Sequence, residues 1–176
     1  MRNATQLLSD YAAYHRDRRN IATHFVGVPM IIFAVCILLS RPSFEVAGLA
    51  LSPAWIVFAI SAAWYLTRGQ LVLGFVTSAI IGAMTLAGAQ VAAGSTATWL
   101  ASGIGLFVVG WVIQFVGHHY EGRKPAFVDD LTGLMIGPMF VFAEMMFLMG
   151  WNKPLLAEIE AKVGPTHLRD MQQPVA

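Results

Sequence analysis

The chain has 176 residues, of which 57% are hydrophobic and only 12% are charged. An average globular domain carries about 25% charged residues, so this chain has too few charges to cover the surface of a soluble domain. The composition therefore excludes a soluble enzyme and a disordered chain, and the single cysteine excludes a disulfide-stabilised secreted domain. The net charge of +1 gives no indication of a nucleic-acid partner.

The N-terminal residues 4–18 predict an amphipathic helix. Leu7 and Tyr11 recur at helical spacing, and charged side chains occupy much of the remaining surface. This helix is too polar to cross a bilayer, so we expect it to lie at the membrane surface.

Three long stretches without a charged side chain follow the N-terminal helix. They hold 21 residues between Arg19 and Arg41, 22 between Glu45 and Arg68, and 52 between Arg68 and Glu121. A transmembrane helix needs roughly 20 apolar residues, so these stretches predict one, one and two spans. The predicted spans cover residues 24–39, 46–66, 71–92 and 98–116. Small residues such as Gly82 and Gly103 would let these helices pack closely.

A fifth apolar segment, residues 131–151, contains Pro138 and the charged Glu144. It predicts either a fifth span or a re-entrant helix, and a polar tail over residues 153–176 follows. We therefore predict an all-α fold: a multi-pass transmembrane bundle of four to five spans, forming one domain over residues 1–176.

The distribution of basic residues predicts the orientation in the membrane. With the N-terminus in the cytoplasm, the inner segments up to residue 130 carry seven Lys and Arg, against only Arg41 in the outer loops. The seven are Arg2, Arg16, Arg18, Arg19, Arg68, Arg123 and Lys124. Four crossings separate the polar motifs of residues 14–24 and 114–123, so both motifs lie on the cytoplasmic side. The membrane would be a bacterial inner membrane, or the endoplasmic reticulum in a eukaryote.

Four of the five histidines lie in these two motifs. His15 and His24 are nine residues apart, which is about 180° around a continuous helix. The helix must therefore bend before the first span, near Arg19 and Asn20, for both rings to face one site.

The second motif contains two adjacent histidines. His118 follows Gln114 by four residues and precedes Glu121 by three, so these three side chains share one helix face. His119 points about 100° away from that face. We therefore expect His118 to face the site.

The convergence of histidines at one membrane face has two interpretations. Two or three neutral imidazoles with a carboxylate suit Fe(II), Zn or Mn, and two histidines with one carboxylate form the open site of non-haem iron oxygenases. Alternatively, histidines at the membrane boundary only form hydrogen bonds with headgroups, in a structural membrane protein.

Glu144 also has two interpretations. An ionisable residue at membrane depth is costly, so it can mark a proton or cation site in a small transporter or channel. It can instead form a structural ion pair with Arg123 or a histidine. The basic residues on the same face similarly indicate either phospholipid anchoring or capture of the carboxylate of an amphiphilic substrate.

At these residues the sequence resembles the Mpo1-like family, membrane proteins formerly grouped as a domain of unknown function and typified by a yeast 2-hydroxy fatty acid dioxygenase. The matching residues are Tyr14-His15, Asn20, His24, Pro29, Trp111, Gln114-Phe115, Gly117-His118, Glu121, Arg123, Pro125-Ala126, Pro138, Phe140 and Glu144. The resemblance extends over residues 14–144, which is most of the chain.

The resemblance implies an Fe(II)-dependent dioxygenase of fatty acid α-oxidation. Such an enzyme uses O2 to convert a 2-hydroxy long-chain fatty acid into CO2 and an acid one carbon shorter, and membrane lipids are its further partners. The family's essential histidines correspond to His15, His24 and His118, which are the expected metal ligands. Candidates for catalytic roles are Glu121, Glu144, Gln114 and Asn20, and candidates for substrate binding are Arg19, Arg123 and Tyr14.

Overall fold

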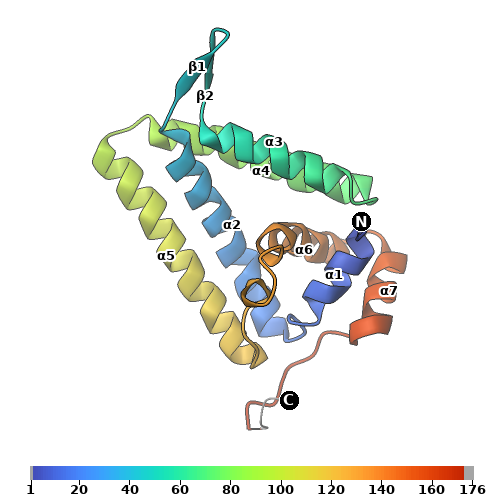
Figure 1. Cartoon of the computed structure of the whole chain (residues 1–176). Coiled ribbons are helices and arrows are strands. Elements are labelled where there is room, and N and C mark those ends of the chain that lie inside the picture. Colours follow the sequence, from blue (N-terminus) through green and yellow to red (C-terminus); the bar gives the residue numbers. More distant parts are fainter. Residues whose placement is uncertain (1, 173–176) are drawn as a thin grey trace. The chain divides into compact units, whose positions relative to one another are not determined.

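The computed structural model describes residues 2–172, which form seven α-helices, one 3-10 turn and one short β-hairpin (Figure 1). The helices are α1 (Ala4–Ala12), α2 (Arg18–Ser40), α3 (Pro53–Leu66), α4 (Leu71–Ala92), α5 (Thr96–Glu121), α6 (Gly133–Leu148) and α7 (Lys153–Val163). The chain divides into two compact units. One comprises Met1–Val28 with Val112–Ala176, and the other comprises Pro29–Trp111.

Within the Pro29–Trp111 unit, glycines allow helices to approach closely. A Cβ added at Gly74 in α4 would lie 2.7 Å from the carbonyl oxygen of Tyr65 in α3, and one added at Gly82 would lie 3.1 Å from the Phe58 ring. A Cβ at Gly103 in α5 would overlap the Leu38 side chain. The small residues therefore serve the close packing that the sequence predicts.

The second predicted span begins later than the sequence indicates. Residues that were expected to start it form the antiparallel strands β1 (Phe44–Val46) and β2 (Leu49–Leu51). The turn residues Ala47 and Gly48 have φ values of 52° and 79°, as a two-residue hairpin turn with the strands' right-handed twist requires. The helix α3 therefore starts at Pro53 and has 14 residues, a length of about 21 Å.

Within residues 2–172, three helices are long and apolar enough to cross a membrane: α2, α4 and α5. The pair α6 and α7 would add a fourth span if it is one broken helix, since the two are bent by 117° at the break between them. The predicted all-α, multi-pass class is confirmed. The count by length is three to four instead of four to five, because the hairpin shortens α3 and because the fifth apolar segment breaks after Leu148.

The unit that contains both termini holds the candidate site. The helix α1 starts at a capping box between Asn3 and Gln6, and it packs against α6 and α7. It ends at Ala12 instead of continuing to residue 18, because the chain turns through residues 13–17 before α2 begins. We call residues 13–17 the corner. The predicted bend exists, but it lies in the corner instead of near Arg19 and Asn20, because both of those residues already belong to α2.

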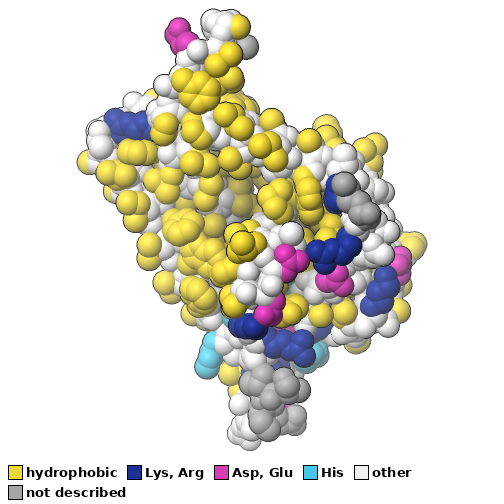
Figure 2. Space-filling view, in the orientation of Figure 1, with side chains coloured by type: hydrophobic (Ala, Val, Ile, Leu, Met, Phe, Trp, Pro, Cys, Tyr) yellow, Lys and Arg dark blue, Asp and Glu magenta, His cyan; other side chains and the backbone are white. Residues whose placement is uncertain are grey.

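Most charged side chains on the visible surface belong to the same unit. Figure 2 shows Lys, Arg, Asp, Glu and His gathered mainly over the elements of this unit, while hydrophobic side chains predominate over α4 and α5. Apolar residues on α4 and α5 are widely exposed, among them Phe75 at 65% and Val112 at 56%. This distribution fits helices that face lipid and a polar unit at a membrane boundary.

Candidate metal centre

Three histidine rings meet inside the unit that contains both termini. His15 comes from the corner, His24 from the second turn of α2, and His118 from the last turn of α5. One nitrogen of each ring lies within 4.8 Å of the corresponding nitrogen of the others, and all three residues are buried. The ring planes are steeply inclined to one another, at 72° to 80°, so the nitrogens converge from three directions.

The backbone fixes the tautomers of His15 and His24. Nδ1 of His15 donates a hydrogen bond of 2.8 Å to the carbonyl oxygen of Tyr11, and Nδ1 of His24 donates one of 2.8 Å to that of Asn20. A carbonyl oxygen only accepts, so both rings carry their proton on Nδ1 and leave Nε2 with a free lone pair. The two Nε2 atoms lie 3.1 Å apart. Two lone pairs that face each other at this distance need a cation between them, which is either a proton or a metal ion.

The third ring adds an unsatisfied nitrogen. Nδ1 of His118 is buried and has no hydrogen-bond partner within residues 2–172. A buried polar atom without a partner is uncommon and costly, and a nitrogen of the same ring belongs to the group that could hold a metal ion. His119, the next residue on α5, is exposed instead.

Aromatic rings shield the three histidines from solvent. The Tyr11 ring stacks on His15 with a centroid distance of 4.2 Å and an interplanar angle of 5°, and Phe140 lies 5.4 Å from His15. Burial in these surroundings lowers the pKa of His15 well below its ordinary value, and positive charge on His24 or His118 would lower it further. The proton is therefore disfavoured as the cation at this position, and a metal ion fits the site better.

Glu121 stands beside the histidines but is occupied by hydrogen bonds. Its carboxylate accepts the backbone N–H groups of Arg16 and Asp17, each at 2.9 Å, and the side-chain amide of Asn20 at 2.9 Å. Among the described residues, neither it nor Glu144 belongs to the group that could hold a metal. The group that could hold a metal ion is therefore three imidazoles, and Glu121 connects the end of α5 to the corner that carries His15.

The two amide side chains near the histidines are both buried. Asn20, one turn before His24, gives its Nδ2 to Glu121, while its Oδ1 has no partner within the described chain. Gln114, one turn before His118, likewise leaves a buried Oε1 without a hydrogen bond among residues 2–172. These two oxygens are the free polar acceptors nearest in sequence to the ligands.

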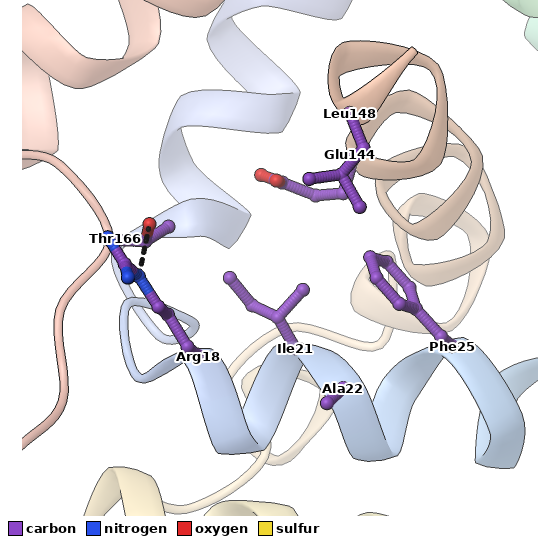
Figure 3. A pocket seen from close by; sticks show the side chains of 7 residues that line it. All are labelled: Arg18, Ile21, Ala22, Phe25, Glu144, Leu148 and Thr166. Carbon is purple, nitrogen blue, oxygen red and sulfur yellow. Dashed lines mark hydrogen bonds between the residues drawn. The ribbon is translucent and has the colours of Figure 1, made fainter.

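Glu144 faces Arg16 instead of Arg123 or a histidine. Its Oε1 lies 3.6 Å from Nη2 of Arg16, and both side chains are about nine-tenths buried. Glu144 also lines a cavity of about 360 Å³ between α2 and α6, whose apolar wall includes Ile21 and Phe25. Figure 3 shows the carboxylate extending from α6 into this space, opposite the α2 side chains. The charge is thus part of an ion pair beside a cavity.

The three side chains expected to bind substrate form bonds within the protein. Arg19 donates to the carboxylate of Asp17 at 2.7 Å, and Tyr14 donates to Asp129 at 3.1 Å. Arg123 is exposed at the end of α5, and its Nη1 donates to the carbonyl oxygen of Ala13 at 2.9 Å. Their roles in substrate binding stay predictions.

Comparison with known proteins connects this geometry to a family. The family model described as 2-hydroxy-palmitic acid dioxygenase Mpo1-like matches residues 1–149. The chain belongs to the Mpo1-like family. It is also 28% identical over 155 residues to the 2-hydroxy-palmitic acid dioxygenase MPO1 of Saccharomyces cerevisiae, covering 87% of this chain and 85% of the yeast protein. No solved structure gives a significant match.

Two residues that hold the site of this Mpo1-like protein in place are not predicted from the sequence. Asp17 is fully buried and accepts hydrogen bonds from the backbone and side chain of Arg19 and from the backbone N–H of Arg169. Tyr11 was predicted only as part of an apolar helix face, yet its carbonyl sets the tautomer of His15. The one available signal was that Tyr11 precedes His15 by one helical turn, the spacing at which a side chain reaches a backbone carbonyl.

Proposed function

We propose that this protein is an Fe(II)-dependent dioxygenase that shortens 2-hydroxy fatty acids by one carbon. The reaction is R–CH(OH)–COOH + O2 → R–COOH + CO2 + H2O, in which the bond between C1 and C2 breaks. C2 is oxidised from an alcohol to a carboxylic acid, and O2 is reduced. The partners are thus a long-chain hydroxy acid, O2 and the surrounding lipid.

The observation that carries the proposal is the pair of facing lone pairs on His15 and His24, together with the His118 ring, one nitrogen of which lies within 4.8 Å of a nitrogen of each. Three neutral imidazoles suit a divalent transition metal and leave positions for other ligands. The name of the yeast relative supplies the substrate class and the use of O2.

Fe(II) held by the three histidines would supply the redox centre at which the hydroxy acid and O2 meet. The protein holds the rings in place through the carbonyls of Tyr11 and Asn20, since each carbonyl fixes one tautomer. The rings of Tyr11 and Phe140 exclude water from the ligand side. Exclusion of water protects a reactive intermediate from side reactions.

We assign distinct roles to the polar residues around the rings. Glu121 orients the corner and so acts through His15, whereas Gln114 offers its free Oε1 to the hydroxyl of the substrate. Glu144 accepts and returns a proton at the cavity. Of the arginines, Arg123 is the one placed to meet an incoming carboxylate, because Asp17 already holds Arg19.

The membrane and its sidedness follow from the charge pattern. The polar unit with the histidines would face the cytoplasm, where the positive-inside bias places the N-terminus. A substrate dissolved in lipid would then present its polar head at the boundary where the histidines lie.

The decisive experiment is a product assay with purified protein, Fe(II), O2 and 2-hydroxyhexadecanoic acid. We expect pentadecanoic acid and CO2, and no product from hexadecanoic acid, which lacks the hydroxyl. His118→Ala is expected to abolish turnover, while the exposed neighbour His119→Ala serves as the matched control and keeps it. Absence of product from the wild-type protein, or full activity in His118→Ala, would overturn the proposal.

A further inference from the structure

The C-terminal tail lies against the corner that carries His15. The backbone N–H of His167 donates to the carbonyl of Arg16 at 2.9 Å, and the backbone N–H of Arg18 donates to the carbonyl of His167 at 2.9 Å. These two bonds form a parallel β-bridge between Asp17 and His167, although 150 residues separate them. The tail thereby holds the backbone directly after His15 through two hydrogen bonds.

Side chains reinforce the bridge on both sides. The carboxylate of Asp17, which is fully buried, accepts the backbone N–H of Arg169 at 2.8 Å. The guanidinium of Arg16 donates to the carbonyl of Gly164 at 3.0 Å. Figure 3 shows a further bond, in which Arg18 at the start of α2 donates to the hydroxyl of Thr166 at 3.4 Å.

The other side of the same backbone is held by Glu121, which accepts the N–H groups of Arg16 and Asp17. The corner is therefore fixed from two directions, by the end of α5 and by the tail. A loop residue without regular hydrogen bonds is ordinarily mobile, whereas a ligand must stay within about 0.5 Å of its working position.

We propose that the tail segment Gly164–Arg169 is a positioning element of the proposed metal centre. Asp17 anchors this segment, because its carboxylate accepts the backbone N–H of Arg169. The segment lies beyond residues 1–149, which the family model matches, so the family match does not assign it this role. By fixing the corner backbone, the tail holds His15 at the distance from His24 that metal binding requires. The inference rests on the proposed metal site.

The test uses single substitutions in the full-length chain that remove one backbone donor. His167→Pro removes the N–H that bonds to Arg16, because proline has no such donor. His167→Ala also removes the imidazole ring but keeps the backbone N–H, so it isolates the effect of the lost hydrogen bond. Leu168→Pro introduces proline one residue later, where the side chain is 65% exposed and the backbone N–H forms no hydrogen bond within residues 2–172.

Binding is measured by optical titration with Co(II), which reports both affinity and the ligand field. We expect His167→Pro to weaken Co(II) binding at least tenfold and to shift its absorption bands, while His167→Ala and Leu168→Pro stay within twofold of wild type. A tail that only adds stability would lower the melting temperature of His167→Pro and leave the spectrum and the affinity unchanged. That result would overturn the proposal, as would equal weakening by both prolines.

A second variant covers the case in which His167→Pro does not fold. Asp17→Asn removes the negative charge of the carboxylate that accepts the Arg169 N–H, and it is compared with Glu158→Gln, which changes an exposed carboxylate of the same unit. Only Asp17→Asn should weaken Co(II) binding, and equal affinity in the two would contradict the proposal. If wild type itself binds no Co(II) or Fe(II), the proposed metal site fails, an outcome distinct from failure of the tail's role.

Discussion

Nε2 of His15 lies 3.1 Å from Nε2 of His24, and neither atom has a proton to offer the other. Both rings donate through Nδ1 to backbone carbonyls, so the contact is repulsive until a cation occupies it. If the proposed metal ion binds here, it removes this repulsion and should stabilise the folded protein.

Metal addition is expected to raise the melting temperature of the wild-type protein. A ligand present at 100 times its dissociation constant stabilises the folded state by about 2.7 kcal/mol. Chelation should reverse the shift. His118→Ala should lose the metal-dependent shift, and the exposed neighbour His119→Ala should keep it. A shift that is equal in the two variants would place the metal elsewhere.

Glu121→Gln is expected to destabilise the protein, because an amide cannot replace a carboxylate that accepts three N–H donors. Its NH2 group would face at least one of those donors. The cost should be about 1.5 to 3 kcal/mol, the range for hydrogen bonds to charged groups. The matched control is Glu158→Gln, which disrupts an exposed pair with Lys162 and should change the free energy of unfolding by less than about 0.5 kcal/mol. Denaturant titration of both variants provides the comparison.

Gly117→Ala tests the close approach of α2 and α5 beside the histidines. A Cβ at this position would overlap the hydroxyl of Thr23 and lie 2.5 Å from Oδ1 of Asn20. We expect a loss of about 1 to 3 kcal/mol from overpacking, together with weaker metal binding, since Asn20 holds His24. Gly105→Ala on the same helix has open space around the added methyl group, so it should be neutral or slightly stabilising. Equal stability of the two variants would contradict this packing.

Acid should destabilise the protein through Asp17. Burial alone would raise the pKa of this carboxyl, but hydrogen bonds from Arg19 and from the backbone of Arg169 outweigh burial and lower its pKa from 3.8 to about 2. The folded pKa lies below the unfolded one, so the contribution is complete above about pH 4 and is lost as the pH falls toward 2. Unfolding curves between pH 5 and pH 2 should fall more steeply for wild type than for Asp17→Asn. Parallel curves would show that the carboxylate contributes nothing.

Helical geometry made part of the site predictable from sequence. The fixed angle per residue places His118 on the face of Gln114 and Glu121 and turns His119 away, and the structure has that arrangement. The long charge-free stretches predicted α2, α4 and α5 for an equally local reason, since a span depends on length and polarity. The stretch of residues 46–66 did not give a full span, because a hairpin occupies its start.

The hydrogen bonds that hold the histidines and the corner in place could not be predicted, because backbone atoms form many of them. The carbonyl of Tyr11 and the N–H of His167 would be present in almost any residue at those positions, so residue type carries no signal for them. The role of Glu121 was left open for a related reason. A carboxylate beside histidines suits a ligand as well as a hydrogen-bond acceptor, and only its three donors distinguish the two.

Two segments of the chain supply the three histidines of the proposed metal centre, and residues 29–111 lie between these segments in the sequence. A ribosome adds His15 and His24 to the chain more than 90 residues before it adds His118. Newly made protein therefore cannot complete the ligand set until most of its membrane segments have been synthesised. A metal ion bound by all three histidines would therefore show that the segments before residue 29 and after residue 111 have come together.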